Sequence, residues 1–146
     1  MTPLFNITDV KEYEFPSLSS GFGNLVPIEF CSLPFTPTRA FTVTEVPIGK
    51  ERGLHAHRLC HQLLFALAGE ISVSVSDGAS SREFLLDNPE KGLHIPPLIW
   101  ASQKYLIRHS LLYVLASQPY SRDDYIEDFE DFTAARLSYQ NGISPV

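Results

Sequence analysis

Alternation of apolar and polar residues is the strongest structural signal in this chain. In the segment 71–76, isoleucine and valine alternate with serines, and in the segment 39–46 apolar residues alternate with Thr42 and Thr44. Successive side chains of a strand point to opposite faces of a sheet, so this pattern is typical of a strand with one buried face. Both segments are therefore predicted to be strands.

Short apolar runs between turn residues predict the remaining strands. They cover residues 25–30, 62–68, 82–86, 93–97, 98–101 and 110–117. The run 62–68 could also form a helix, but its neighbours favour a strand. Pro27 interrupts the first run, and because proline cannot donate to a sheet, this strand is expected at an edge. Asp77 and Gly78 predict the turn of a hairpin.

The spacing of these segments predicts an all-β fold. Strands recur about every 8 to 12 residues with turns between them, which favours a sandwich or a barrel. At 146 residues the chain is long enough for one domain with its own core. We expect this domain to span residues 1–137 and to begin with an N-terminal arm. A flexible tail is expected at residues 138–146.

One short helix is expected near the C-terminus. In the segment 123–132, Tyr125, Phe129 and Phe132 recur at helical spacing, and Ser121 is placed to cap the first turn. The acidic residues of this segment suit the positive end of a helix dipole and a solvated face.

The charge and the cysteines narrow the class of protein. The net charge of −6 argues against general affinity for nucleic acid. No run approaches the roughly 18 apolar residues that a membrane-spanning helix needs. Cys31 and Cys60 form no recognisable disulfide framework, so we expect a cytoplasmic protein with reduced thiols. Lys50, Arg52 and Arg58 form a local basic cluster that suits a small anionic ligand.

Three of the five histidines lie in the segment 51–62. His55 and His57 are two residues apart, so on a strand both imidazoles would point to the same face. Each can gain or lose a proton near neutral pH. They could be polar surface residues, metal ligands, or a pair of acid/base residues that face a pocket, and we favour the third interpretation.

The spacing around these histidines resembles the first motif of the cupins, G-x5-H-x-H-x3-4-E-x6-G. The matching residues are Gly49, His55, His57 and Gly69. Gln62 stands where the motif has an acidic metal ligand, and Ala101 stands at the histidine of the second motif, G-x5-P-x-G-x2-H. An alanine cannot bind a metal, and an amide is a poor substitute for a carboxylate. His61 and His94 lack the motif spacing. The resemblance thus implies the double-stranded β-helix, or jelly-roll barrel, of the cupins, without a metal ion.

From about residue 22 to 133 the chain further resembles the nucleotide-sugar 3,4-ketoisomerases (TDP-4-oxo-6-deoxyglucose 3,4-oxoisomerases). The most specific part is Arg-Gly-x-His-Ala-His at 52–57 combined with Asp-Tyr-Ile at 124–126. Other matching residues are Pro34, Phe35, Arg39, His61, Gln62, Gly69, Asp77, Gly78, Leu86, Asp87, Gly92, Leu93, Ile95, Pro96, Pro97, Trp100, Leu115, Ala116, Ser117, Tyr120, Asp123 and Phe132. The chain departs from the family at Phe41, Thr42 and His94, where tyrosine is common.

This resemblance implies an isomerase of deoxysugar biosynthesis that needs no cofactor. The carbonyl of a TDP-linked 4-keto-6-deoxyhexose would move from C4 to C3 through an enediol(ate), with His55 and His57 transferring the protons. Arg52 would stabilise the enediolate or bind the diphosphate, unless it is a surface charge. Gln62 would bind a sugar hydroxyl, unless it is a core amide. The resemblance also implies a homodimer with exchanged strands.

Three further residues complete the candidates for the site. Trp100 could stack on the nucleotide base or belong to the core, and Lys104 and Tyr105 are additional candidates for binding. Two other functions compete with the isomerase. A 3,5-epimerase shares the cupin fold, the TDP-sugar and a histidine base, and a non-catalytic cupin could bind a sugar nucleotide. Fold alone does not separate these functions.

Overall fold

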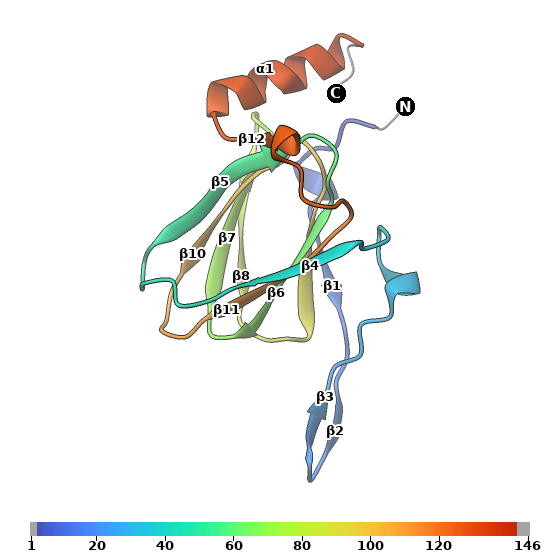
Figure 1. The fold of residues 1–146 in the computed structure, drawn as a ribbon, viewed down its shortest axis with the longest axis vertical. Helices are drawn as coiled ribbons and strands as arrows, with labels where there is room; N and C mark the ends of the chain where they lie inside the picture. Colours follow the sequence, from blue (N-terminus) through green and yellow to red (C-terminus); the bar gives the residue numbers. More distant parts are fainter. Residues whose placement is uncertain (1–2, 143–146) are drawn as a thin grey trace.

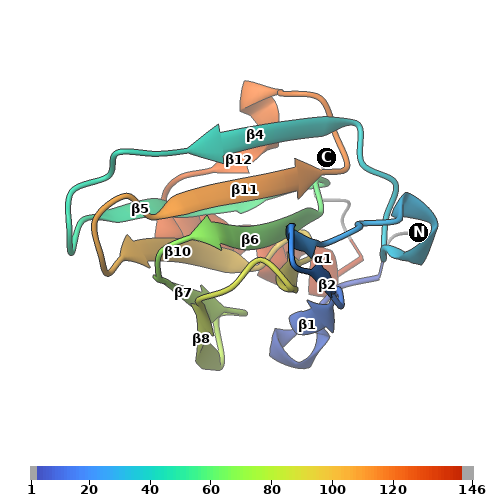
Figure 2. The same cartoon turned by 90° about the horizontal axis from the view of Figure 1, so that it is seen from below.

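Two five-stranded antiparallel sheets form the body of the protein (Figures 1 and 2). The computed structural model describes residues 3–142. The first sheet has the order β1–β9–β6–β11–β4, with bounds Lys11–Glu14, Lys91–Ile95, Gln62–Ala68, Leu111–Ala116 and Arg39–Val43. The second has the order β12–β5–β10–β7–β8, with bounds Tyr125–Ile126, Glu51–His57, Trp100–Tyr105, Ile71–Ser76 and Ser81–Leu86. The predicted all-β architecture is confirmed.

Shorter elements surround the two sheets. Helix α1 (Phe129–Gln140) lies across one end of the barrel, and the hairpin β2–β3 (Leu18–Ser20 and Gly23–Leu25) projects from the opposite end (Figure 1). Short 3₁₀ turns occur at Ile7–Asp9, Phe30–Ser32 and Arg122–Asp124. No helix within residues 3–142 is long and apolar enough to cross a membrane.

The main core lies between the sheets and follows the alternation seen in the sequence. Ile71, Val73 and Val75 of β7 are buried there, while the serines between them are only partly buried. A second cluster covers the outer face of the first sheet, where Leu63 and Phe65 of β6 pack against Phe15. Residues 63–66 of β6 are buried on both faces, which accounts for the continuous apolar run in this part of the strand.

A third cluster lies beneath α1 and corrects the predicted helix. The helix begins at Phe129, because the side chain of Asp128 accepts a hydrogen bond from the backbone N–H of Asp131 (3.0 Å) and so caps it. Residues 123–132 are therefore not one helix. Tyr125 and Ile126 form strand β12, which pairs with β5. At its other end α1 continues past the predicted boundary at residue 137 to Gln140, and residues 143–146 of the predicted tail lie outside the described part.

The N-terminal arm also differs from the prediction. The segment 25–30 is not a strand: Leu25 ends β3, residues 26–29 have no regular structure, and Phe30 starts a 3₁₀ turn. Pro27 has no backbone N–H to donate to a neighbouring strand. Strand β1 pairs with β9, and β2 pairs with β3 in a hairpin. The sequence has no alternation of apolar and polar residues in these segments that predicts a strand.

The two short strands expected at 93–97 and 98–101 are shifted. Strand β9 ends at Ile95 and β10 starts at Trp100, so Pro96–Ile99 form the connection, in which Leu98 has a left-handed φ of 57°. Strand β10 instead extends to Tyr105 and brings Gln103 into the sheet.

Candidate active site

A cavity of about 290 Å³ opens between the two sheets. Its polar wall consists of Arg52, His55, Gln62, Gln103, Tyr125 and Glu127. Apolar residues from β4, β6 and β11 form the remaining wall: Phe41, Val43, Leu64, Leu112 and Val114. A partly apolar cavity with a few convergent polar groups is typical of a small-molecule site.

A β-bulge in β5 brings Arg52 and His55 to the same side of the sheet. Arg52 pairs with Gln103 and His55 pairs with Ala101, but Leu54 has no partner on β10. Residues three apart on a regular strand face opposite ways, so the additional residue restores a common face. Gly53 permits the bulge, because its φ is +88° and an added Cβ would lie 3.0 Å from Oε1 of Gln103.

His55 and His57 lie side by side, as predicted from their spacing. Their ring centroids are 5.0 Å apart and the rings meet edge to face. The ring of Tyr125 packs on both, at 5.1 Å from His55 and 4.5 Å from His57. His55 lines the cavity, and the adjacent His57 is buried, with 6% of its surface exposed.

Asp124 fixes the orientation of His57. Its Oδ2 lies 2.9 Å from Nδ1 of His57, and its Oδ1 accepts a hydrogen bond from the backbone N–H of Leu59 at 2.7 Å. Burial raises the pKa of Asp124, but the hydrogen bonds from His57 and from the backbone outweigh this effect, and the pKa lies below its usual value. An ionised carboxylate only accepts hydrogen bonds, so Nδ1 of His57 carries the proton.

This tautomer leaves Nε2 of His57 as a hydrogen-bond acceptor. Nε2 is buried and has no hydrogen-bond partner among the described residues. A buried imidazole nitrogen with a free lone pair and a fixed ring orientation is suited to accept a proton from a bound molecule.

His55 is held in its neutral form. Burial and the neighbouring His57 lower the pKa of His55, although a backbone hydrogen bond at Gly53 and the charge of Glu127 oppose this shift. Two imidazoles in contact cannot readily both be protonated, because their charges repel each other. Burial and a charge on His57 thus both favour the neutral ring of His55.

The structure places the other predicted residues in two groups. Arg52 and Gln62 line the cavity together with His55. Trp100 does not: its ring packs on Phe129 and Phe132 of α1, at 5.2 and 5.6 Å. Lys104 is exposed on the outer side of β10, because the residues that point inward on this strand are Gln103 and its alternate neighbours.

Tyr105 lies in the main core and not at the site. It is fully buried, its hydroxyl has no hydrogen-bond partner among the described residues, and burial raises its pKa to about 12. Trp100, Lys104 and Tyr105 therefore do not line this cavity, and a part for them in substrate binding stays a prediction.

The positions that hold the metal in the cupin motifs contain no anionic ligand. Gln62 presents an amide to the cavity, and Ala101 belongs to the main core. A hydrogen bond of 3.0 Å joins Nδ1 of His61 to Nε2 of His94. The two rings lie next to Phe35 and Tyr13 at the outer face of the first sheet. They are therefore on the other side of the sheet from the cavity.

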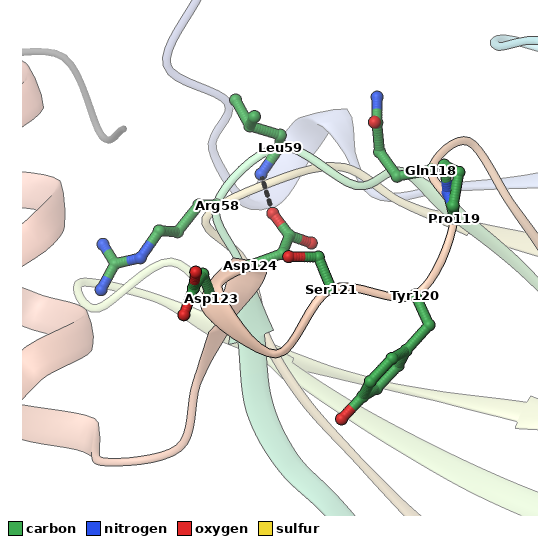
Figure 3. Close-up of a pocket in the computed structure, with 8 residues that line it drawn as sticks. All are labelled: Arg58, Leu59, Gln118, Pro119, Tyr120, Ser121, Asp123 and Asp124. Carbon is green, nitrogen blue, oxygen red and sulfur yellow. Dashed lines mark hydrogen bonds between the residues drawn. The ribbon is translucent and has the colours of Figure 1, made fainter.

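A second pocket, of about 370 Å³, lies next to Asp124 (Figure 3). Its wall includes Arg58, Leu59, Tyr120 and Asp123, and the carboxylate of Asp124 reaches it. Asp124 thus lies between this pocket and His57.

Sequence reasoning did not assign the roles of Asp124, Tyr125, Gln103 and Glu127. The Asp-Tyr-Ile segment was recognised as part of the family pattern, which was a usable signal for the first two. Nothing marked Gln103, because its place in the cavity depends on the pairing of β10 with β5.

The match to a family model extends across nearly the whole chain. The model, described as FdtA: WxcM-like, C-terminal, matches residues 8–137. A relative from Aneurinibacillus thermoaerophilus, TDP-4-oxo-6-deoxy-alpha-D-glucose-3,4-oxoisomerase, is 32% identical over 123 residues, which cover 84% of this chain and 88% of the relative.

Solved structures of ketoisomerases share the fold. QdtA, a sugar 3,4-ketoisomerase from Thermoanaerobacterium thermosaccharolyticum in complex with TDP, has a TM-score of 0.87 and 28% identity, with 91% of this chain and 98% of QdtA covered. A 3,4-ketoisomerase from Helicobacter canadensis has a TM-score of 0.85 and 27% identity, with 88% and 98% covered.

An epimerase also shares the fold, but at a greater distance. The dTDP-4-dehydrorhamnose 3,5-epimerase of Bacillus anthracis has a TM-score of 0.74 and only 17% identity, with 83% of this chain and 79% of the epimerase covered, a likeness of fold alone. The predicted resemblance to ketoisomerases and the predicted isomerase class are confirmed by the family model and by the relatives. This chain belongs to the FdtA family of WxcM-like C-terminal domains.

Proposed function

We propose that the protein is a TDP-sugar 3,4-ketoisomerase that converts a TDP-linked 4-keto-6-deoxyhexose to its 3-keto isomer. The observation that carries the proposal is the pair His55 and His57 beside the cavity, with Asp124 holding His57 in one tautomer. The oxoisomerase from Aneurinibacillus thermoaerophilus and the TDP complex of QdtA support the substrate class.

The reaction only moves protons. A base removes the proton on C3, which the C4 carbonyl acidifies, and the electrons form a C3–C4 double bond while O4 takes up a proton. The resulting enediol then loses the proton on O3 as the C3 carbonyl forms, and C4 receives a proton. No electron or atom is gained overall, so the imidazoles of this site are sufficient.

We assign to His57 the role of the base that removes the proton from C3. We assign to His55 the transfer of the proton between O3 and O4. His57 has a fixed ring and a vacant Nε2, and His55 lies in the cavity wall in contact with it. Because Nε2 of His57 is shielded from solvent, the proton taken from C3 can be returned to C4. In D₂O, the product then keeps part of the original hydrogen at C4.

Arg52, Gln62 and Gln103 are assigned to binding. Arg52 carries the positive charge of the cavity wall, which suits the developing enediolate or a diphosphate oxygen. The two amides face the cavity and can bind sugar hydroxyls. The proposed reaction requires no metal, and chelators are expected to leave the activity intact.

The identity of the product tests this function. TDP-4-keto-6-deoxyglucose is incubated with the protein and followed by NMR. A 3-keto-6-deoxyhexose is expected, a suitable substrate for a separate aminotransferase. A 4-keto product with an inverted C3 or C5 would instead identify a 3,5-epimerase, and an unchanged sugar that still binds would identify a binding protein.

We also propose a homodimer with C2 symmetry. Hairpin β2–β3 projects from the barrel and carries apolar side chains that are largely exposed, Leu18 at 64%, Phe22 at 104% and Leu25 at 62%. Exposed apolar side chains on a projecting hairpin are typical of a surface that a second copy covers.

A further inference from the structure

We propose that His57, Cys60 and Asp124 form a zinc site whose occupation switches off the isomerase. This inference deepens the proposed function and rests on the role of His57 in it. One ligand atom from each residue lies within 4.8 Å of the others. An imidazole, a thiol and a carboxylate are the ligand types that zinc takes from proteins.

The three ligands need only small movements to bind zinc. With bonds of about 2.0 to 2.3 Å, the ligands of a tetrahedral zinc are about 3.3 to 3.7 Å apart. The atoms here are at most 4.8 Å apart, and Nδ1 of His57 is 2.9 Å from Oδ2 of Asp124. Zinc would therefore pull the sulfur inward by about 1 Å and enter between His57 and Asp124.

The second pocket provides a route to this cluster. The carboxylate of Asp124 reaches the pocket wall, where it is bonded to the N–H of Leu59 (Figure 3). Asp123 adds a negative charge to the wall, and Arg58 adds a positive one. The volume of about 370 Å³ leaves room for a water molecule as the fourth ligand.

Cys60 is chemically available to a metal. It is a free thiol, buried to 1% exposure, and its Sγ donates a hydrogen bond to the carbonyl oxygen of His61 at 3.3 Å. When zinc binds, the thiol releases its proton to solvent and the thiolate coordinates the metal. Thiolate and carboxylate together neutralise the charge of the ion.

Zinc binding would disable the base through its tautomer. Nδ1 of His57, the nitrogen beside Asp124, gives its lone pair to the metal, so the ring proton must move to Nε2. Nε2, which is unprotonated in the metal-free protein, then carries the proton and cannot act as a base. Catalysis stops even though zinc does not contact the cavity.

Cobalt titration tests the site without using the activity. Co²⁺ added to the metal-free protein should bind once per chain and give a sulfur-to-cobalt charge-transfer band, which zinc abolishes by displacement and Mg²⁺ does not. The band should be lost in Cys60→Ala and kept in Cys31→Ala, the matched control at the exposed cysteine. A wild-type protein without the band, or a band that survives in Cys60→Ala, overturns the proposal.

Inhibition tests the consequence. Zinc should inhibit turnover of TDP-4-keto-6-deoxyglucose by wild-type and Cys31→Ala, reversibly with EDTA, and about tenfold more zinc or beyond should be needed for Cys60→Ala. In ¹⁵N NMR the ring proton of His57 should move from Nδ1 to Nε2 when zinc binds. Equal inhibition of both cysteine variants refutes the inference and leaves the isomerase standing. A cobalt band through Cys60 in a protein without isomerase activity refutes the proposed function and leaves the metal site standing.

Discussion

The chemistry of His57 depends on one carboxylate 67 residues further along the chain. Asp124 accepts a hydrogen bond from Nδ1–H and thereby leaves Nε2 as an acceptor, so in the proposed mechanism it is a positioning residue and not a catalytic one. This division of labour resembles that of other histidine bases, in which a carboxylate selects the tautomer.

Replacing Asp124 by asparagine tests this role. An amide can donate to Nδ1 and so stabilise the opposite tautomer, and we expect kcat to fall about 10²-fold with KM little changed. The ring proton of His57 should appear on Nε2 in ¹⁵N NMR. Asp123→Asn, at the adjacent exposed carboxylate, is the matched control and should keep kcat. A kcat of Asp124→Asn close to that of the control would contradict the positioning role.

A second histidine pair makes stability depend on pH. His61 and His94 stack with centroids 5.2 Å apart, against Phe35 and Tyr13. Burial, and then the charge of His61, lower the pKa of His94 to about 4. The unfolded chain binds this proton near the ordinary pKa of about 6.5, so the stability from the neutral ring is complete above that pH and decreases as the pH falls toward 4.

The expected loss can be measured by urea unfolding. Between pH 7 and pH 5, the free energy of unfolding should fall by about 2 kcal/mol more in the wild type than in His94→Gln, which cannot take up the proton. His109→Gln, at an exposed histidine, should behave as the wild type. Parallel pH profiles of wild type and His94→Gln would refute this account.

How far the residues of the site could be predicted depends on the range of the interaction. His55 and His57 share a strand, so their spacing alone placed them together. The prediction of a site without a metal ion also used local spacing, because Gln62 and Ala101 stand at ligand positions of the cupin motifs. Asp124 and Gln103 come from other segments and meet these residues only through strand pairing, which spacing does not reveal.

At the scale of elements, a bulge and a cap explain two departures from the predicted pattern. Leu54 is the extra residue that turns Arg52 into the cavity, and Asp128 starts α1 later than the aromatic spacing suggested. Tyr125 has helical spacing to Phe129, but its backbone pairs with His57 instead. Tertiary pairing thus overrode a local helical signal.

Arg136 fastens α1 to the barrel. It is buried, and its Nη1 donates a hydrogen bond to the carbonyl oxygen of Leu98, whose φ is left-handed. Arg136→Met keeps the aliphatic volume but leaves this carbonyl without its donor, so we expect a loss of about 2 kcal/mol in the free energy of unfolding. Gln140→Met, at an exposed position of the same helix, should cost almost nothing. Equal unfolding midpoints of the two variants would contradict the role of Arg136.

At the scale of the whole molecule, the alternation of apolar and polar residues predicts the barrel but not the structure of the N-terminal arm. The alternating strands 39–43 and 71–76 lie in different sheets whose inner faces form one core. The arm has no such alternation: Val10 enters the main core, Phe15 packs on the outside of the first sheet, and the hairpin β2–β3 is exposed. We expect the role of the arm to lie in the proposed dimer.

The assembly can be measured by light scattering. We expect a mass of twice 16.4 kDa for the wild type. Phe22→Ser combined with Leu25→Ser should shift the protein toward the monomer, because these side chains would lose the apolar surface that the second copy covers. Leu137→Ser, at an exposed leucine of α1, should remain dimeric. A wild-type mass of 16.4 kDa would rule out the dimer.

The turnover of TDP-4-keto-6-deoxyglucose by His57→Asn tests the central claim most directly. Asparagine keeps polarity and approximate size but cannot take up a proton near pH 7. We predict that kcat falls by about 10²- to 10⁴-fold, as expected for a lost general base, while TDP binds with unchanged affinity. His55→Asn should also be impaired, and His109→Asn, at an exposed histidine, should match the wild type. If His57→Asn and His55→Asn both turn over the sugar at nearly the wild-type rate, the histidine pair is not the proton-transfer site and the account is wrong.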